Sequence, residues 1–219
     1  MRLASHDSEG GLNVILDLLA FLLFAGITWA VASEGAWGAA LVLIEVTFAA
    51  LIATSFWQPI AGFLSAQSPE WRFWWQYVVL MFLFIGVLAT IRAVSGALSP
   101  RMPRFPTLVE QAGRWLLAAC AAWVFLGFFY MSLHMAPLAR EFLGFEPERR
   151  SFVGTAPDRH WLGFMYRTSR DVFDRSGNTH VFDPQGLFLP SYASWRESYE
   201  DPEIIEAKIT AEEFQPNAP

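Results

Sequence analysis

Long runs of hydrophobic residues dominate the chain up to residue 137. Four runs of about twenty residues are separated by short polar stretches, at about 12–33, 36–57, 73–92 and 114–136. An α-helix of about 20 apolar residues crosses the hydrocarbon core of a bilayer. The runs are continuous rather than spaced at amphipathic intervals, which distinguishes membrane spans from the helices of a soluble core. The pattern predicts an all-α integral membrane protein whose four transmembrane helices form a bundle over residues 12–137.

Prolines and charges predict where these spans end. The second span is predicted to end at Gln58-Pro59, because proline disfavours a helical conformation in the residue before it. The moderately apolar stretch 60–69 is then expected to be interfacial or re-entrant. Arg92 is predicted to close the third span, and three prolines before Arg114 argue against a continuous helix in the next loop. His134 and Pro137 mark the predicted exit of the fourth span.

The segments that flank the spans are polar. Residues 1–11 form a short N-terminal segment, and residues 138–219 form a C-terminal extension that is predicted to be mostly irregular, with short helices. Trp161, Leu162 and Met165 are spaced for one face of an amphipathic helix, which would pack on the bundle or lie on the membrane. Acidic residues and prolines after Asp201 predict a disordered end.

The composition agrees with a chain that has one part in lipid and another part in water. Hydrophobic residues make up 54% of the chain and charged residues only 16%, whereas about a quarter of residues are charged in soluble domains. The net charge of -6 comes mostly from the extension, where seven acidic residues lie between Glu197 and Glu213. The expected partner is the lipid bilayer, and an acidic extension excludes nucleic acid as a partner.

The sequence contains none of the motifs that carry common enzyme chemistry. There is no Gly-x-Ser-x-Gly segment, and no phosphate-binding loop is possible because Lys208 is the only lysine. The histidines lack the i, i+4 spacing of a metalloprotease helix, and Cys120 is the only cysteine. We therefore expect a non-enzymatic protein with no catalytic residues, no cofactor and no metal site.

Asp17 and Glu45 are the acidic residues that lie inside predicted spans. A charged group at membrane depth costs a few kcal/mol on insertion scales, so it is usually paired, protonated or turned towards water. One hypothesis places both carboxylates on a proton or cation path. The other places Asp17 near the interface at a helix N-terminus, and bonds Glu45 to Thr47, Ser55 or a neighbouring helix.

The order of these features matches a known pattern. Asp17 lies early in the first span, a glycine-bearing turn from Gly35 to Gly38 follows eighteen residues later, and the second span is rich in Ala and Leu. A fully apolar third span follows, and a polar loop then leads into the fourth span at residues 111–114, Gln-Ala-Gly-Arg. Over about residues 12–137 the chain resembles the colicin V production protein family of bacterial inner-membrane proteins.

That resemblance implies a non-enzymatic factor associated with toxin production or export and with envelope maintenance. Such a protein would act as a membrane scaffold or assembly component and contact other membrane or envelope proteins. The family arrangement implies a multi-pass protein of the bacterial inner membrane with both termini outside the cytoplasm. The chain departs from the family at the first turn, where Glu34 and Ala36-Trp37 replace a basic residue and an aromatic.

Two further points bear on topology and function. Five arginines near span ends lie on the side of the membrane that holds the N-terminus, the 58–72 loop and the extension, and four lie on the other side. These four are concentrated in the 92–114 loop, which slightly favours a cytoplasmic position for that loop. Small residues in the fourth span permit a homo-oligomer. The competing hypothesis is a small channel or transporter subunit with Asp17 and Glu45 on its ion path.

Overall fold

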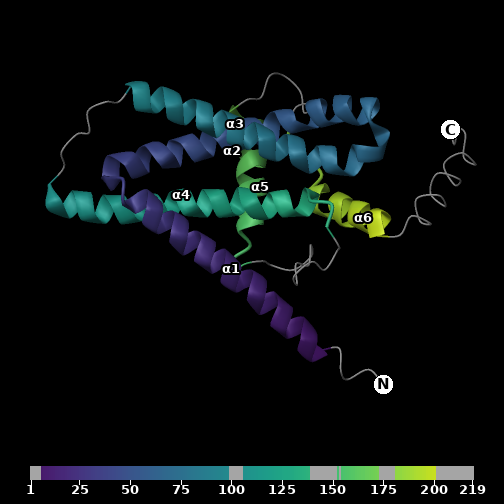
Figure 1. Cartoon of the computed structure of the whole chain (residues 1–219), viewed down its shortest axis with the longest axis horizontal. Helices are drawn as coiled ribbons and strands as arrows, with labels where there is room; N and C mark the ends of the chain where they lie inside the picture. Colours follow the sequence, from purple (N-terminus) through teal and green to yellow (C-terminus); the bar gives the residue numbers. More distant parts are fainter. Residues whose placement is uncertain (1–5, 99–105, 139–151, 153, 173–180, 201–219) are drawn as a thin grey trace, which may run out of the picture.

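Four long helices form the framework of the molecule. The computed structural model describes residues 6–98, 106–138, 152, 154–172 and 181–200. Within these residues every regular element is helical, which confirms the predicted fold class. The long helices are α1 (His6–Ala32), α2 (Gly35–Gln67), α3 (Arg72–Leu98) and α4 (Thr107–Met135) (Figure 1). All four are long and apolar enough to cross a membrane, so the chain is a multi-pass membrane protein.

The shorter elements connect the spans or belong to the C-terminal extension. They are η1 (Pro69–Trp71), α5 (Pro157–Arg167), a π-helical turn η3 (Thr168–Val172) and α6 (Phe188–Glu200). The predicted turn at 176–178 and the predicted disordered end at 201–219 lie outside the described residues.

Helix α2 is longer than predicted. The sequence placed its end at Gln58-Pro59, but the helix continues through Pro59 to Gln67 and replaces the expected interfacial piece. An interior proline costs a helix about 3 kcal/mol, because it removes one hydrogen bond and crowds the preceding turn. Packing on both sides offsets this cost, since Trp57 before the proline is 1% exposed and Ala61 after it is fully buried.

Helices α3 and α4 also extend beyond their predicted limits. Helix α3 does not close at Arg92 but runs on to Leu98, and α4 begins at Thr107 rather than near residue 114. Near each of these ends a charged residue is bonded to α2 or to the turn before it. Arg92 forms ion pairs with carboxylates, and Glu110 in the first turn of α4 accepts a backbone hydrogen bond from α2.

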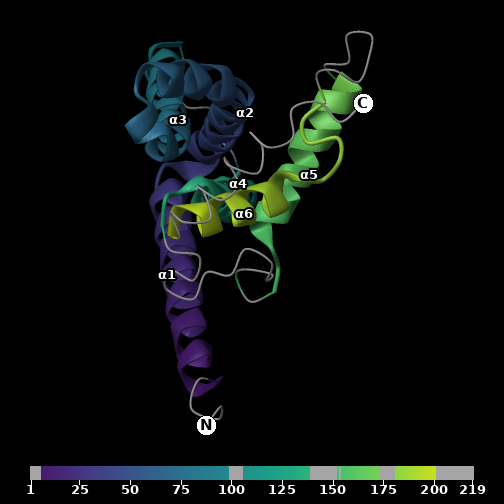
Figure 2. The same ribbon diagram turned by 90° about the vertical axis from the view of Figure 1, so that its right-hand side faces the viewer.

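Helix α2 occupies the centre of the bundle and packs against both α3 and α4, while α1 packs mainly on α4. Figure 2 shows α1 diverging from the other three helices towards the N-terminus. Small side chains line the central contact, which lets the helix backbones approach closely, as is typical of helix pairs in lipid. The fully or almost fully buried alanines are Ala39, Ala49, Ala50, Ala53 and Ala61 of α2, and Ala118, Ala121 and Ala122 of α4.

The C-terminal extension packs back onto the bundle. Helix α5 packs across α4, and the opposite end of α5 reaches away from the long helices (Figure 2). Trp161 and Met165 are 4% and 3% exposed, so the amphipathic face packs on the bundle. Gly127 of α4 makes this crossing possible, because a side chain there would come within 2.8 Å of the Pro157 carbonyl oxygen.

Helix α6 is held by aromatic contacts at the far end of α2. The ring of Tyr192 lies 6.2 Å from that of Trp57 and 4.8 Å from that of Phe188. Burial raises the pKa of the Tyr192 phenol above its ordinary value, because the charged phenolate is disfavoured away from water. The phenol therefore stays neutral throughout the physiological range.

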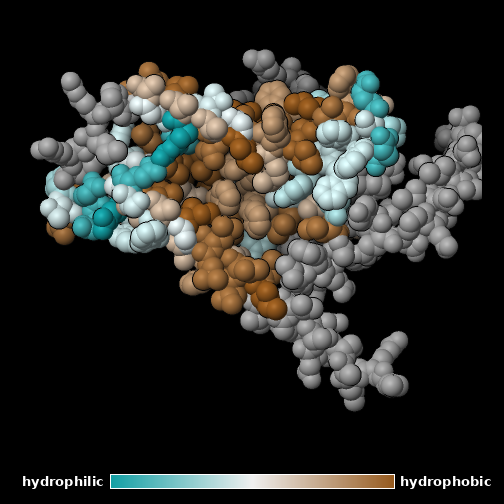
Figure 3. Space-filling model, in the orientation of Figure 1, coloured by the Kyte–Doolittle hydropathy of each residue, from teal (hydrophilic) through white to brown (hydrophobic). Residues whose placement is uncertain are grey.

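The surface has the distribution expected of a protein in a bilayer. Hydrophobic residues cover the middle of the face in Figure 3, and hydrophilic residues gather towards its two ends. Large apolar side chains point outward from the spans, including Phe82 at 77% exposure and Leu116 at 67%. Exposed apolar surface on this scale would be unfavourable in water, whereas hydrocarbon solvates it.

Candidate functional site: two polar clusters in the bundle

The first cluster lies between α2 and α3 and comprises Glu34, Glu45, Arg92 and Ser95; we call it the arginine cluster. Glu45 of α2 is 2% exposed. The Arg92 Nη1 donates a hydrogen bond to its Oε2 at 3.1 Å, and the Ser95 hydroxyl donates to its Oε1. Arg92 and Ser95 are three residues apart and therefore share one face of α3. Glu45 is thus bonded to a neighbouring helix, one of the partners considered from the sequence.

Arg92 joins a second carboxylate to the same cluster. Its Nη2 lies 2.5 Å from Oε1 of Glu34, in the turn that precedes α2. The side chains of Arg92 and Glu34 are 45% and 35% exposed, so this ion pair is worth about 1 kcal/mol at most. Glu45 is different, because a buried carboxylate that loses its cation destabilises a protein by about 3–5 kcal/mol. One guanidinium therefore compensates a buried carboxylate and a partly exposed one.

The turn between α1 and α2 requires glycine at both positions singled out in the sequence. Gly35 has a φ of +82°, and a side chain there would come within 2.8 Å of Glu110 Oε1. A side chain at Gly38 would come within 2.6 Å of the Glu34 Cβ. Glu110 is the residue that the sequence did not reveal. Its Oε1 accepts a hydrogen bond from the Ala36 N–H at 2.8 Å, which satisfies a free donor at the α2 N-terminus.

Asp17 lies in a different interface from Glu45. It is half-buried on α1, between Leu16 and Ala20, which belong to a cluster that packs against Tyr130 of α4. The expected position at a helix N-terminus is wrong, because α1 begins at His6, about three turns earlier. The structure therefore does not bring the two predicted carboxylates together: Asp17 faces α4, and Glu45 faces α3.

The second cluster is a buried hydrogen-bonded pair that the sequence did not suggest. His134 at the end of α4 and Asp158 in the first turn of α5 have side chains that are 1% exposed, and Nε2 lies 3.1 Å from Oδ2. We call these two residues the histidine pair. They are 24 positions apart, on a predicted span and on the polar extension, so no local pattern links them. Only the crossing of α5 over α4 brings them together.

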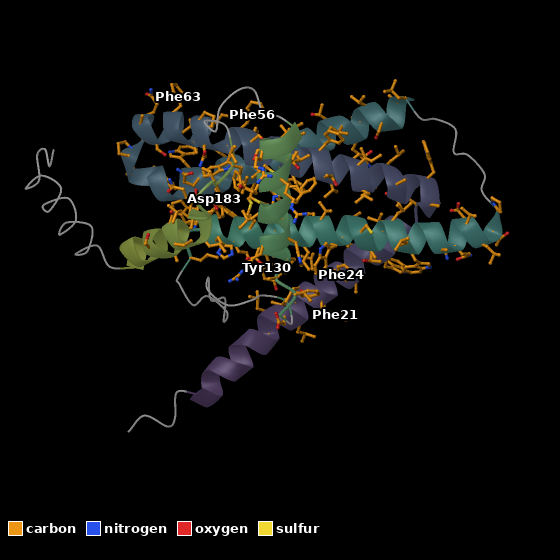
Figure 4. The ribbon with its side chains drawn as sticks, turned by 180° about the vertical axis from the view of Figure 1, so that it is seen from behind. Phe21, Phe24, Phe56, Phe63, Tyr130 and Asp183 are labelled. Carbon is orange, nitrogen blue, oxygen red and sulfur yellow. The ribbon has the colours of Figure 1, made fainter. Side chains whose placement is uncertain are left out.

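Tyr130 lies one turn before His134 and is fully buried. Among the described residues, no hydrogen-bond partner reaches its hydroxyl or the Oδ1 of Asp158. Figure 4 shows Tyr130 on α4 near the crossing with α5. Leu16 and Ala20 of α1 belong to the same packed cluster as Tyr130, so α1 meets α4 at this ring.

The two clusters connect helices: the arginine cluster joins α2 to α3, and the histidine pair joins α4 to α5. Over the described part of the chain, no group of three or more His, Cys, Asp or Glu residues is arranged to hold a metal ion. Comparisons with protein-family models, curated proteins and solved structures gave no match to this chain. The likeness to the colicin V production family therefore rests on the sequence features alone.

Proposed function

We propose that this multi-pass membrane protein is a non-catalytic scaffold or assembly component that works through contacts with other membrane or envelope proteins, as the resemblance to the colicin V production family implies. The supporting observation is the way Glu45 is bonded. A carboxylate that carries protons or ions must exchange them with water. Glu45 is instead 2% exposed, with one oxygen bonded to Arg92 and the other to Ser95. A carboxylate bonded in this way links α2 to α3 and stabilises their contact.

The extension supports the same proposal from outside the spans. Helices α5 and α6 are anchored on the bundle by Trp161 and Tyr192, yet Phe164 and Leu187 remain 42% and 50% exposed. A polar segment fixed in this way offers a preorganised surface to a partner. By the same resemblance, we propose that the bilayer is the bacterial inner membrane and that both termini lie outside the cytoplasm.

Site-specific photo-crosslinking tests the scaffold proposal. A photoreactive amino acid at Leu187 samples the extension, and the same amino acid at Phe82 samples the outward face of α3. We expect the Leu187 probe to form a reproducible crosslink to one membrane or envelope protein, identified by mass spectrometry, and the Phe82 probe to form none. Identical crosslinks at both positions, or no protein crosslink at Leu187 in native membranes, would contradict the proposal.

The alternative is a small channel or transporter subunit, and the partial exposure of Arg92 favours it. At 45% exposure, this guanidinium connects the buried Glu45 with the outside of the helix pair. Ion or proton flux into vesicles that contain the purified protein distinguishes the two functions. The scaffold proposal predicts no flux above that of empty vesicles. Flux that is abolished by Glu45→Gln, in a variant that still melts as a folded protein, would establish the alternative.

A further inference from the structure

A cavity of about 420 Å³ lies where the extension packs on α2 and α3. Gln58 of α2 and Gln76 of α3 line it on the side of the bundle, and residues 181–183 with the start of α6 line it on the side of the extension. A volume of this order is typical of sites for small molecules. Neither the arginine cluster nor the histidine pair contributes a lining residue, so the cavity is separate from both.

The surroundings of the cavity place it near the polar edge of the membrane. Gln76 lies four residues after Arg72, the first residue of α3, which is about 6 Å along the helix. Trp71 and Trp74 are 55% and 41% exposed beside it in sequence, and tryptophans at the end of a span are typical of the headgroup region. A charged group can therefore enter the cavity from water or from the headgroups.

Asp183 gives the cavity its charge. Its Oδ1 accepts a hydrogen bond from the Leu187 N–H at 2.7 Å, and its Oδ2 accepts one from the Phe188 N–H at 3.1 Å. These bonds fix the carboxylate at the start of α6, beside the long helices (Figure 4). Both donors are neutral, and each oxygen keeps a further lone pair. Asp183 forms no ion pair with the described part of the chain, and it is the only charged residue among the described residues of the lining.

Aromatic rings and amides form most of the remaining lining. The ring of Phe188 lies 5.7 Å from that of Phe182 and 4.8 Å from that of Tyr192, and all three residues line the cavity. Aromatic rings attract cations electrostatically. The amide oxygens of Gln58 and Gln76 accept hydrogen bonds from N–H donors. A carboxylate, aromatic rings and amide oxygens together suit an organic cation that carries N–H groups.

We propose that this cavity binds a primary ammonium group, with the nitrogen beside Asp183 and the attached carbon chain against Phe188 and Tyr192. The N–H donors of the ammonium bond to the carboxylate and to the glutamine amides. Two sources supply this group at a membrane surface, a soluble amine and the ethanolamine headgroup of a phospholipid. The occupant contacts α2, α3 and α6 at once, so its binding also stabilises the extension on the bundle.

A matched pair of ligands and a matched pair of variants test the charge at this site. The ligands are phenethylamine and phenethyl alcohol, titrated by calorimetry into the detergent-solubilised full chain. Asp183→Asn keeps an oxygen acceptor at the start of α6 but removes the charge. Glu70→Gln removes an exposed carboxylate in the α2–α3 turn that does not line the cavity. Thermal melting followed by tryptophan fluorescence verifies that both variants are folded.

We expect the alcohol to bind about tenfold more weakly than the amine, because it forms no charge-assisted hydrogen bond with Asp183. Asp183→Asn should weaken the amine by a similar factor, and Glu70→Gln should leave its affinity unchanged. Gln76→Leu keeps a side chain of similar size and should weaken the amine about threefold, through the loss of one hydrogen bond.

Native mass spectrometry of the same solubilised chain distinguishes the two sources. The probes are phosphatidylethanolamine and phosphatidylcholine, whose headgroup carries the same positive charge but no N–H donor. A phosphatidylethanolamine adduct that exceeds the phosphatidylcholine adduct, and that Asp183→Asn reduces, identifies the lipid headgroup. Binding of phenethylamine without such a preference identifies a soluble amine. Equal binding by the unmodified chain and Asp183→Asn, equal binding of amine and alcohol, or no binding of either amine probe would overturn the proposal.

Discussion

The arginine cluster and the histidine pair both place ionisable groups inside the bundle, but they are built differently. Glu45 is buried while its partner Arg92 is 45% exposed, so the cluster reaches from the interior to the outside of α2 and α3. His134 and Asp158 are both 1% exposed. The arginine cluster joins two neighbouring spans, through Glu45 inside the second apolar run and Arg92 at the end of the third. The histidine pair joins a span to the extension.

This difference explains why the sequence singled out one member of the arginine cluster, Glu45, and neither member of the histidine pair. A glutamate in an apolar run stands out, because membrane depth makes any ionisable residue expensive. His134 lies at the end of its run and Asp158 in a polar segment, where charged residues are ordinary. Neither residue is unusual in its local sequence, and only the crossing of α5 over α4 brings the two side chains into contact.

The largest expected effect comes from removing the cation of the arginine cluster. Arg92→Leu leaves Glu45 buried without a charge partner and should lower the free energy of unfolding in mild detergent by about 3–5 kcal/mol. The double variant Glu45→Leu/Arg92→Leu removes both charges and should recover most of that loss. If the double variant is no more stable than Arg92→Leu alone, the ion pair is not what joins α2 and α3.

An intermediate effect is expected at the histidine pair. His134→Ala removes the partner of Asp158 Oδ2 and should destabilise the protein by about 1–3 kcal/mol, the cost of an unsatisfied buried polar group. The loss should appear in the extension first. Limited proteolysis would then cut near α5 while the spans stay intact. Ser191→Ala, on the exposed face of α6, is the control and should leave the cleavage rate unchanged.

The smallest effect is expected at the exposed end of the arginine cluster. Glu34→Gln keeps a hydrogen-bond acceptor for Arg92 and should change the free energy of unfolding by no more than about 0.5 kcal/mol. The measurement is the same detergent unfolding used for Arg92→Leu. A loss as large as that of Arg92→Leu would show that both carboxylates depend equally on Arg92, and would remove the distinction between the buried and exposed ion pairs.

The ends of the individual helices show how much of the structure can be predicted from local sequence. Pro59 and Arg92 were reasonable boundaries, since proline lacks an N–H and arginine is costly in lipid. The helices pass both residues, because Trp57 and Ala61 are buried around the proline and Glu45 bonds the guanidinium. Such contacts lie between residues far apart in the chain, and no local window contains them.

The sequence by itself determined that the chain is helical and crosses a membrane, because runs of about 20 apolar residues satisfy their backbone hydrogen bonds only as helices in hydrocarbon. It also identified Gly35 and Gly38 at the first turn and Glu45 within the second span. Only the tertiary structure decided that Arg92 and Ser95 bond Glu45, that Glu110 caps α2, and that His134 meets Asp158. The physical reason is that partners are chosen by helix crossings, which depend on small residues such as Gly127 packed against a distant segment.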